Sequence, residues 1–330
     1  MSTIYDIAKR AGVSTTTVSR ALNNHSDVKL STRKRLQRLA SEMGYQPNIK
    51  AKSLALKRSW SLGILLIDHA DTGLKHTLFA NIVEAISKAA AKRGYDITFL
   101  SRNLGESYVT YLQHANYRQF DGIIVANINI NDHQVKELFS HVEHIACIDQ
   151  HTPNAICVNS QNKEGMKITL YHLFEKGHRN ITYIHGQKDN YVTEERIKGF
   201  TESAKQLGIL EQCTFIEGKY TSPTKAYEIT KEIIKNGLPD AIVYSDDYSA
   251  SGGLKCLHEH GIKVPEDVAI MGYDGVPLAK LLHPELTTIY QNTTKIGEVV
   301  TENLINSIED NRSIGYIIEL PVYLIKGKTT

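Results

Sequence analysis

The chain has 330 residues, of which 41% are hydrophobic and 22% are charged, a composition typical of globular proteins with two or three domains. No apolar run approaches the roughly 18 residues that a membrane span needs, and the N-terminus lacks the basic-then-apolar pattern of a signal peptide. The four cysteines form no C-x-x-C pair, so neither a disulfide framework nor a zinc site is indicated, and we expect a cytoplasmic protein without a bound metal.

The net charge of +2 is unevenly distributed along the chain. Residues 1–58 contain 12 Lys or Arg against 3 Asp or Glu, a net charge of +9. The other 272 residues hold 26 basic and 33 acidic side chains, a net charge of −7. A basic segment attached to a mildly acidic body suggests a polyanionic partner for the first segment only. A merely soluble helical segment could carry the same charge. The residue pattern therefore has to show whether the segment binds a polyanion.

Three short helices are predicted near the N-terminus. Thr3 is placed to cap the first helix, and Gly12 ends it. Ser14 is a good cap for the second helix. Ser31 is expected to cap the third, whose apolar residues recur at helical spacing until Gly44.

The second of these helices has two different faces. One face carries apolar side chains, and the other carries short or donor-rich side chains close to a helix N-terminus: Thr15, Thr16, Ser19 and Arg20. This arrangement is typical of a helix-turn-helix, in which small polar groups and an arginine reach base edges in the major groove. Arginine can bond O6 and N7 of guanine together, the commonest base-specific contact. Residues 1–46 therefore predict an α-helical, helix-turn-helix DNA-binding headpiece.

Several short runs stand at fixed spacings in this segment: Thr3-Ile4-Tyr5-Asp6-Ile7-Ala8, Ala11-Gly12-Val13-Ser14, Thr17-Val18-Ser19-Arg20, Leu22-Asn23, Ser31-Thr32-Arg33 and Gly44-Tyr45-Gln46-Pro47-Asn48. Together they resemble the signature of the lactose/galactose repressor family of bacterial transcription regulators. The resemblance implies a repressor that binds near-palindromic operator DNA and responds to a small-molecule effector.

The resemblance also assigns roles to individual residues of the headpiece. Thr15, Thr16 and Arg20 match the family's base-reading positions. Four further residues match positions that hold the DNA backbone: Tyr5, Asn23, Thr32 and Tyr45. Phosphate contacts fix the register of a protein on DNA, whereas base contacts choose the sequence. Core packing is an alternative role for Tyr45, and the two roles are compatible.

Residues 47–58 are predicted to form a hinge. Pro47 ends the three-helix unit, and the good helix formers that follow have no apolar stripe long enough for a core, so the segment alone would be a marginal helix. In the family that it resembles, this hinge is helical only on the operator, where Ala51, Leu54 and Ala55 lie in the minor groove. The leucine there wedges between base pairs and kinks the DNA. The alternative is that Leu54 is a linker leucine buried against the body of the protein.

After Trp60 the pattern changes to alternating strands and helices. Buried strands are predicted at 62–67, 96–100, 122–126, 144–149, 181–186, 241–244 and 268–273, with a helix at 78–93. Repeated βαβ units predict an α/β domain made of two doubly wound lobes. The resemblance implies lobes of the periplasmic-binding-protein type, with the chain crossing between them near Val158, Tyr290 and Leu320.

We therefore expect a headpiece at 1–46, a hinge helix at 47–58 and an effector-binding and dimerisation domain at 59–330. The N-terminal lobe should comprise about 59–158 and 291–319, and the C-terminal lobe about 159–290 and 320–330. The sequence stops right after the last expected strand, with no heptad helix of the kind that tetrameric members of the family carry. We expect a homodimer.

The effector is expected in the cleft between the lobes, because ligands of doubly wound sheets bind beyond the carboxyl ends of the strands. Carboxylates and a guanidinium suit a sugar, since each can bond two neighbouring hydroxyls, and aromatic faces can cover its apolar side. By resemblance, six positions match the effector contacts or pocket positions of the family: Phe79, Asp149, Arg196, Tyr220, Asp247 and Gln291.

Other interpretations remain open for parts of this site. Arg196, at the expected start of a helix, and Asp247 could form a structural ion pair between the lobes, and Phe79 could belong to the core. Asp274 is interpreted as a turn residue and left out. Asn159 stands where many relatives have an acid, and the loop 68–76 lacks the Asn-Pro-aromatic run common in the family, so local detail and the pocket mouth are expected to differ.

Three rival functions were weighed. An enzyme is disfavoured because the chain has no P-loop, G-x-S-x-G, H-E-x-x-H or G-x-G-x-x-G after a strand, and no cofactor is expected. The histidines at 141, 144, 258 and 260 are better explained as solvated surface residues than as metal ligands. A transport binding protein would need export and would have no use for residues 1–58. A global regulator that answers to a phosphorylated protein stays open, as does whether the effector releases DNA or promotes its binding.

Overall fold

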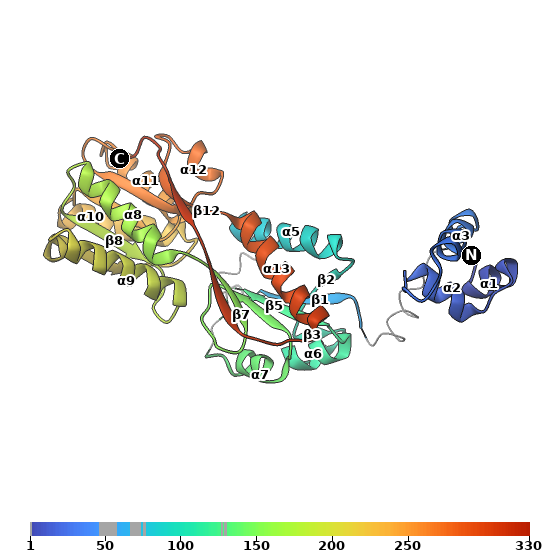
Figure 1. Ribbon diagram of the computed structural model, residues 1–330. Coiled ribbons are helices and arrows are strands. Elements are labelled where there is room, and N and C mark those ends of the chain that lie inside the picture. Colours follow the sequence, from blue (N-terminus) through green and yellow to red (C-terminus); the bar gives the residue numbers. More distant parts are fainter. Residues whose placement is uncertain (1, 46–57, 67–73, 75–76, 127, 129–130) are drawn as a thin grey trace. The chain divides into compact units, whose positions relative to one another are not determined.

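The computed structural model of the chain describes residues 2–45, 58–66, 74, 77–126, 128 and 131–330 (Figure 1). The chain divides into two units, residues 1–59 and 60–330. The predicted hinge residues Ala51, Leu54 and Ala55 lie outside the described residues. In the described part of the chain, no helix is both long and apolar enough to cross a membrane.

The smaller unit contains the helices α1 (Ile4–Ala11), α2 (Thr15–Leu22) and α3 (Leu30–Glu42). Two predicted caps are confirmed. The hydroxyl of Thr3 accepts a hydrogen bond from the Asp6 backbone N–H at 3.3 Å, and that of Ser14 accepts one from the Thr17 backbone N–H at 3.1 Å. Each bond satisfies a donor that the first turn of a helix leaves without an intrahelical partner.

The third helix begins earlier than predicted. It starts at Leu30 with Lys29 as its cap residue, so Ser31 lies inside the first turn and makes no capping bond. Tertiary contacts set this start: the side chain of Val28 is buried in the core of the unit, and Arg33 donates to the Val28 carbonyl at 3.2 Å. The core that the three helices share is formed by Ile7, Ala8, Val18, Ala21, Val28, Leu36 and Ala40.

The larger unit holds two six-stranded sheets within the described residues. The strands of the first are all parallel and follow the order β13 (Tyr316–Leu320), β7 (Ile156–Ser160), β6 (Ile145–Ile148), β5 (Gly122–Ala126), β1 (Ser61–Leu66) and β2 (Asp96–Phe99). Its two faces are covered by α5 (Thr77–Lys92) with α13 (Thr293–Asp310), and by α6 (Tyr111–Arg118) with α7 (His133–His141). A short hairpin of β3 (Asn103–Leu104) and β4 (Ser107–Tyr108) precedes α6. We call this part the N-lobe.

The second sheet belongs to the C-lobe. Its order is β14 (Val322–Ile325), β12 (Thr287–Gln291), β11 (Ala269–Asp274), β10 (Ala241–Tyr244), β8 (Ile181–His185) and β9 (Cys213–Glu217), and only β14 runs antiparallel to its neighbour. The covering helices are α8 (Asn162–Glu175) with α9 (Tyr191–Gln206) on one face, and α10 (Pro223–Asn236) with α11 (Asp247–Glu259) on the other. Two short turns of helix, Leu210–Gln212 and α12 (Leu278–Leu281), complete the lobe.

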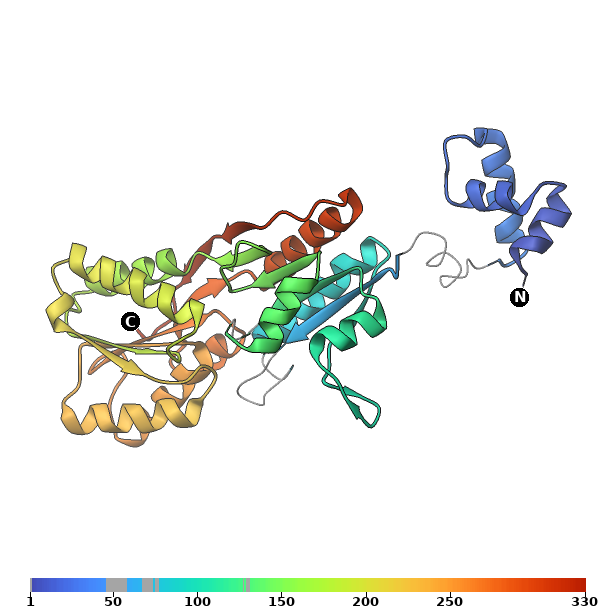
Figure 2. The same ribbon diagram turned by 90° about the horizontal axis from the view of Figure 1, so that it is seen from below.

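The chain passes between the two sheets at three points, which both views of the ribbon show side by side (Figures 1 and 2). The first crossing follows β7, the second follows β12, and the third joins β13 to β14; each takes a single residue between the elements that it joins. Because β7 and β12 both end at a crossing, the carboxyl ends of the parallel strands in the two sheets face each other. The predicted fold class, a helical headpiece followed by two doubly wound α/β lobes, is confirmed.

Candidate functional site

The second helix of the headpiece presents the predicted base-reading residues. Thr16 and Arg20 are exposed and Thr15 is partly exposed, while Val18 and Ala21 on the opposite side are fully buried in the core. The helix therefore docks by one face and leaves the other accessible, as a major-groove reader requires.

The four residues predicted to hold the DNA backbone lie in different surroundings. Tyr5, on α1, is 72% exposed. Asn23 follows α2 and donates from its side chain to the Ser19 carbonyl at 2.9 Å, and Thr32 lies half-buried in the first turn of α3. Tyr45 packs against the core of the headpiece, so the alternative role proposed for it from the sequence is present in the structure.

In the C-lobe, Arg196 is the centre of a buried polar cluster. It lies in the second turn of α9, which begins at Tyr191 and therefore earlier than predicted, and it is only 3% exposed. Its Nε donates to Asn162 Oδ1 at 2.8 Å, and its Nη1 donates to the Ser245 carbonyl at 2.9 Å. The guanidinium carbon also lies 3.5 Å from the centre of the Tyr273 ring, a cation–π contact. These contacts hold the guanidinium plane in one orientation.

A carboxylate that sequence reasoning left out belongs to this cluster. Asp274 is the last residue of β11, and its Oδ1 lies 3.8 Å from Nη2 of Arg196. Gln291, at the end of the neighbouring strand β12, donates to the same oxygen at 2.7 Å. Burial raises the pKa of Asp274 well above its ordinary value, and the positive charge of Arg196 opposes the shift. The backbone of Asp274 has a positive φ of 101°, as a turn residue can, but the strand runs one residue further than its pattern indicates and the side chain belongs to the cluster.

Asp149 brings a second carboxylate from the N-lobe. It follows β6 directly and has a positive φ of 58°, a left-handed conformation that is uncommon for residues other than glycine. Its Oδ1 is closed off from solvent and has no hydrogen-bond partner among the described residues. Burial raises the pKa of Asp149 to about 6, and Arg196 opposes this shift. A buried acceptor without a partner calls for an explanation, and a bound ligand that donates a hydrogen bond is one.

Tyr220 and Phe79 are aromatic, but their settings differ. Tyr220 follows β9, its hydroxyl accepts a hydrogen bond from Thr193 Oγ1 at 3.0 Å, and its ring centre lies 5.8 Å from the guanidinium of Arg196. The ring rests on Gly186, where a Cβ atom would come within 2.0 Å of it. Phe79 lies on α5 in the N-lobe and packs, partly buried, against the core of that lobe.

Asp247 lies near the cluster, since its charge contributes to the raised pKa of Asp274, but its own hydrogen bonds go to other residues. The residue is fully buried at the start of α11, where its Oδ1 accepts a hydrogen bond from Thr288 at 2.5 Å. Its Oδ2 accepts one from the backbone N–H of Val276 at 2.8 Å. Burial raises the pKa of Asp247 to about 7, and these hydrogen bonds oppose the shift. All of these partners belong to the C-lobe, so Asp247 fixes the loop after β11, and among the described residues it forms no ion pair with the N-lobe.

That loop reaches the other lobe. Val276 is 4% exposed and belongs to the core cluster of the N-lobe, together with residues of α5 and α13. Beside Asp247, the hydroxyl of Tyr248 lies 2.8 Å from Thr77 Oγ1 at the start of α5. Asp247 therefore supports a contact between the lobes indirectly, by holding the backbone that carries Val276.

Asn159 is also placed by hydrogen bonds. It is 1% exposed, exchanges hydrogen bonds with the backbone of Gln150 at 2.9 and 3.1 Å, and donates to the Tyr191 hydroxyl at 3.2 Å. An amide can donate and accept at once, which an ionised carboxylate cannot, so asparagine fits this position.

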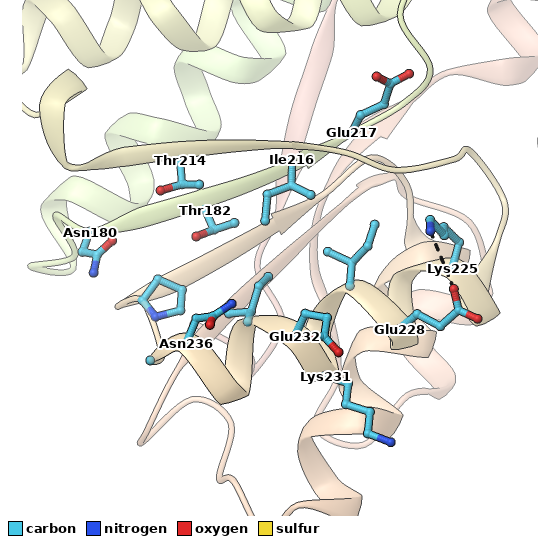
Figure 3. A pocket seen from close by; sticks show the side chains of 14 residues that line it. Asn180, Thr182, Thr214, Ile216, Glu217, Lys225, Glu228, Lys231, Glu232 and Asn236 are labelled. Atoms are coloured by element: carbon cyan, nitrogen blue, oxygen red, sulfur yellow. Dashed lines mark ion pairs between the residues drawn. The ribbon is translucent and has the colours of Figure 1, made fainter.

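The described part of the larger unit contains hollows, two of which can be compared with the site. One, of about 360 Å³, is formed by Asn81, Glu84 and Lys88 of α5 together with Asp274 and Gln291, and so adjoins the cluster. The other, of about 850 Å³, is a groove between the edge strand β9 and α10 (Figure 3). None of the predicted site residues lines that groove. Among the described residues, no group of three or more His, Cys, Asp or Glu is placed to hold a metal ion.

Known proteins resemble the chain over its whole length. Residues 3–48 match the family model described as bacterial regulatory proteins, lacI family, and residues 170–330 match that of a periplasmic binding protein-like domain. The ribose operon repressor of Halalkalibacterium halodurans is 30% identical, covering 100% of this chain and 97% of that protein. The transcriptional repressor PurR of Aliivibrio salmonicida is 28% identical, covering 100% and 99%. Among solved structures, the lac repressor dimer bound to operator and an anti-inducer superimposes with a TM-score of 0.80 at 26% identity, covering 100% and 99%.

A helix-turn-helix headpiece joined to a two-lobed α/β domain, with a buried polar cluster at the strand ends, defines a ligand-controlled, DNA-binding transcription repressor. The chain belongs to the lacI family of bacterial regulatory proteins.

Proposed function

We propose that the chain is a cytoplasmic repressor of a sugar-utilisation operon, without enzymatic activity, whose operator affinity is set by a small sugar bound between the lobes. The observation that carries this proposal is a rigidly held, buried guanidinium paired with the carboxylate of Asp274, together with a second carboxylate, that of Asp149, which feels the charge of Arg196 and whose buried Oδ1 has no hydrogen-bond partner among the described residues. Such groups bond neighbouring hydroxyls in pairs. A relative named for a ribose operon makes D-ribose the first sugar to test.

The effector contacts that we propose are Arg196, Asp149, Tyr220 and Gln291, with Asp274 added from the structure. Phe79 would line the N-lobe side of the site. Asp247, which the sequence placed among the contacts, takes a supporting role because its oxygens are occupied within its own lobe.

For DNA we propose a homodimer with one headpiece on each half of a near-palindromic operator. Thr15, Thr16 and Arg20 would read bases. The backbone would be held by Tyr5, Asn23, Thr32 and Tyr45, and the minor groove by Ala51, Leu54 and Ala55 of the hinge. Leu54→Ala should then abolish operator bending in a gel-shift assay while the headpiece stays folded. Unchanged bending would show that Leu54 does not insert between base pairs.

The test of sugar control uses the full chain and an operator selected from random duplexes. Operator affinity is measured with and without D-ribose, other sugars and free purine bases. Allosteric coupling of this kind is typically about 1–3 kcal/mol, a change of roughly 5- to 150-fold in operator affinity. Arg196→Lys should keep operator affinity but lose the response, because lysine keeps the charge and lacks the planar fork.

Lys198→Ala is the matched control, since Lys198 lies on the same helix and its side chain is 53% exposed. We expect this variant to respond as the unaltered chain does. If Arg196→Lys and Arg196→Ala both respond to the sugar with unchanged coupling, the ligand binds elsewhere. If no small molecule alters operator affinity, a regulator that answers to a phosphorylated protein becomes the better account.

A further inference from the structure

The candidate base-reading arginine of the headpiece has an anionic neighbour. Nη1 of Arg20 lies 2.5 Å from Oδ2 of Asp27, with both side chains about half exposed. Asp27 stands in the loop between α2 and α3, seven residues after Arg20, and neither the sequence motif nor the proposed function uses it.

The loop that carries Asp27 is fixed, so Asp27 is the stationary member of the pair. Arg33 reaches from α3 and donates to the carbonyls of His25 at 2.6 Å and Val28 at 3.2 Å. The backbone N–H of His25 in turn donates to the Arg20 carbonyl at 3.0 Å. Val28, next to Asp27, is buried in the headpiece core.

A second anchor lies at the start of the same loop. Gln37 of α3 donates to the side chain of Asn24 at 2.8 Å and to the Ala21 carbonyl at 3.3 Å. Between these two anchors the Cα position of Asp27 is set by the fold, whereas Arg20 is a long side chain with several rotatable bonds. The carboxylate therefore determines where the guanidinium lies, and not the reverse.

The contact leaves Arg20 able to read a base. A guanidinium has five N–H donors, and Asp27 engages Nη1 only, so the other nitrogens can still meet O6 and N7 of guanine. Two consequences follow for binding. The side chain is ordered before it meets DNA, which lowers the entropy cost of the base contact. The negative charge beside it also makes a swing of the guanidinium onto a phosphate unfavourable.

We propose that Asp27 is a specificity-determining residue of this repressor, which positions Arg20 for a base edge instead of a phosphate. The inference rests on the proposed base-reading role of Arg20. Because the pair is exposed, its effect should be modest: about a two- to fivefold change in base preference, the range that corresponds to exposed ion pairs.

A second exposed ion pair in the headpiece provides a control for the loss of negative charge. Glu42 forms an exposed pair with Arg38 on α3, at 2.9 Å, in the same headpiece. Asp27→Ala and Glu42→Ala each remove one negative charge and one ion pair from this basic unit. The two variants should therefore raise the affinity for non-operator duplex DNA by the same factor, because that affinity depends on the net charge of the headpiece.

The experiment compares full-length Asp27→Ala, Asp27→Asn, Glu42→Ala, Arg20→Ala and the double variant Arg20→Ala/Asp27→Ala. Each binds a duplex library randomised over one half-site, and the bound DNA is sequenced. We expect Asp27→Ala to lose two- to fivefold in preference at the base pair whose preference Arg20→Ala abolishes. Asp27→Asn, which keeps an acceptor oxygen, should fall between it and the unaltered chain. Glu42→Ala should keep the preference, and the double variant should match Arg20→Ala.

Each other outcome has a definite meaning. If Asp27→Ala and Glu42→Ala give the same base profile, Asp27 does not position Arg20 and the inference fails, while the base-reading role of Arg20 stands. If Asp27→Ala changes the profile even without Arg20, the carboxylate contacts a base itself and the positioning role is overturned. If Arg20→Ala leaves every preference unchanged, the proposed base-reading role fails, and the inference fails with it.

Discussion

Replacing Asp149 by asparagine should raise the stability of the protein and abolish its response to the effector. The side chain keeps its shape but loses its charge, so Asp149→Asn relieves the burial of a carboxylate whose Oδ1 has no partner among the described residues. The same change removes a strong acceptor for a sugar hydroxyl. We therefore expect a more stable protein that no longer answers its effector.

The size of the gain follows from the pKa of Asp149. A pKa of about 6 in the folded chain, against an ordinary value of 3.8, sets an upper bound of about 3 kcal/mol on the stability lost to this carboxylate above pH 6. The sign follows from proton release: as the pH rises the unfolded chain loses the proton first, so the penalty is absent below pH 3.8 and complete above pH 6. Burial of the new polar amide also costs free energy, so the net gain at pH 7.5 should be about 1–2 kcal/mol.

Trp60 makes the measurement simple, because it is the one tryptophan of the sequence and lies in the larger unit. Urea unfolding followed by its fluorescence should show a higher midpoint for Asp149→Asn at pH 7.5, and a stability difference that is smaller by about 1.4 kcal/mol, and so close to zero, at pH 5. The reasoning is refuted if the variant is less stable at pH 7.5, or if its advantage does not shrink as the pH falls. Asn162→Ala tests the cluster without altering a charge, and its difference from the unaltered chain should not depend on pH.

Further perturbations test other parts of the structure. Ser14→Ala removes a helix cap and should lower the stability of the headpiece by about 0.5–2 kcal/mol in a thermal melt followed by circular dichroism, unless another group replaces the cap. Gly186→Ala should displace the ring of Tyr220 and weaken sugar binding in calorimetry, with operator affinity unchanged; normal sugar binding would remove Tyr220 from the site. Asp247→Ala removes the acceptor of the Val276 backbone N–H, should loosen the loop after β11, and should reduce sugar–operator coupling. Normal coupling would show that the loop does not link the lobes. Light scattering at micromolar concentration should give the mass of two chains, and a mass of four would contradict the proposed homodimer.

Local patterns in the sequence were enough for the fold class and for many of the elements. Thr3 and Ser14 cap the helices predicted for them because a cap depends only on residues within one turn. Continuous apolar runs predicted seven of the parallel strands, and the predicted strand 122–126 is β5 in the structure. The buried strands β7 and β12 were not predicted. Arg20 was singled out because its helix has one apolar and one polar face.

The choice among acidic residues needed the tertiary structure. Asp149, Asp247 and Asp274 all follow apolar runs, and the sequence does not show where a strand ends and the next helix begins. Asp274 ends a strand and so faces the cluster, whereas Asp247 begins a helix and is turned into its own lobe. A shift of one residue along a strand moves a side chain to the opposite face, which is why spacing alone could not separate them.

The start of α3 and the neighbour of Arg20 were also decided by packing. Ser31 has the chemistry of a cap, but the burial of Val28 sets the start of the helix two residues earlier, with Lys29 as the cap residue. The same loop places Asp27 beside Arg20, a contact between residues seven apart that no local rule contains. Capping and burial patterns act within a few residues, so the sequence determined the headpiece and the two lobes. Which charged groups meet depends on how separate segments pack, and only the folded chain decided that.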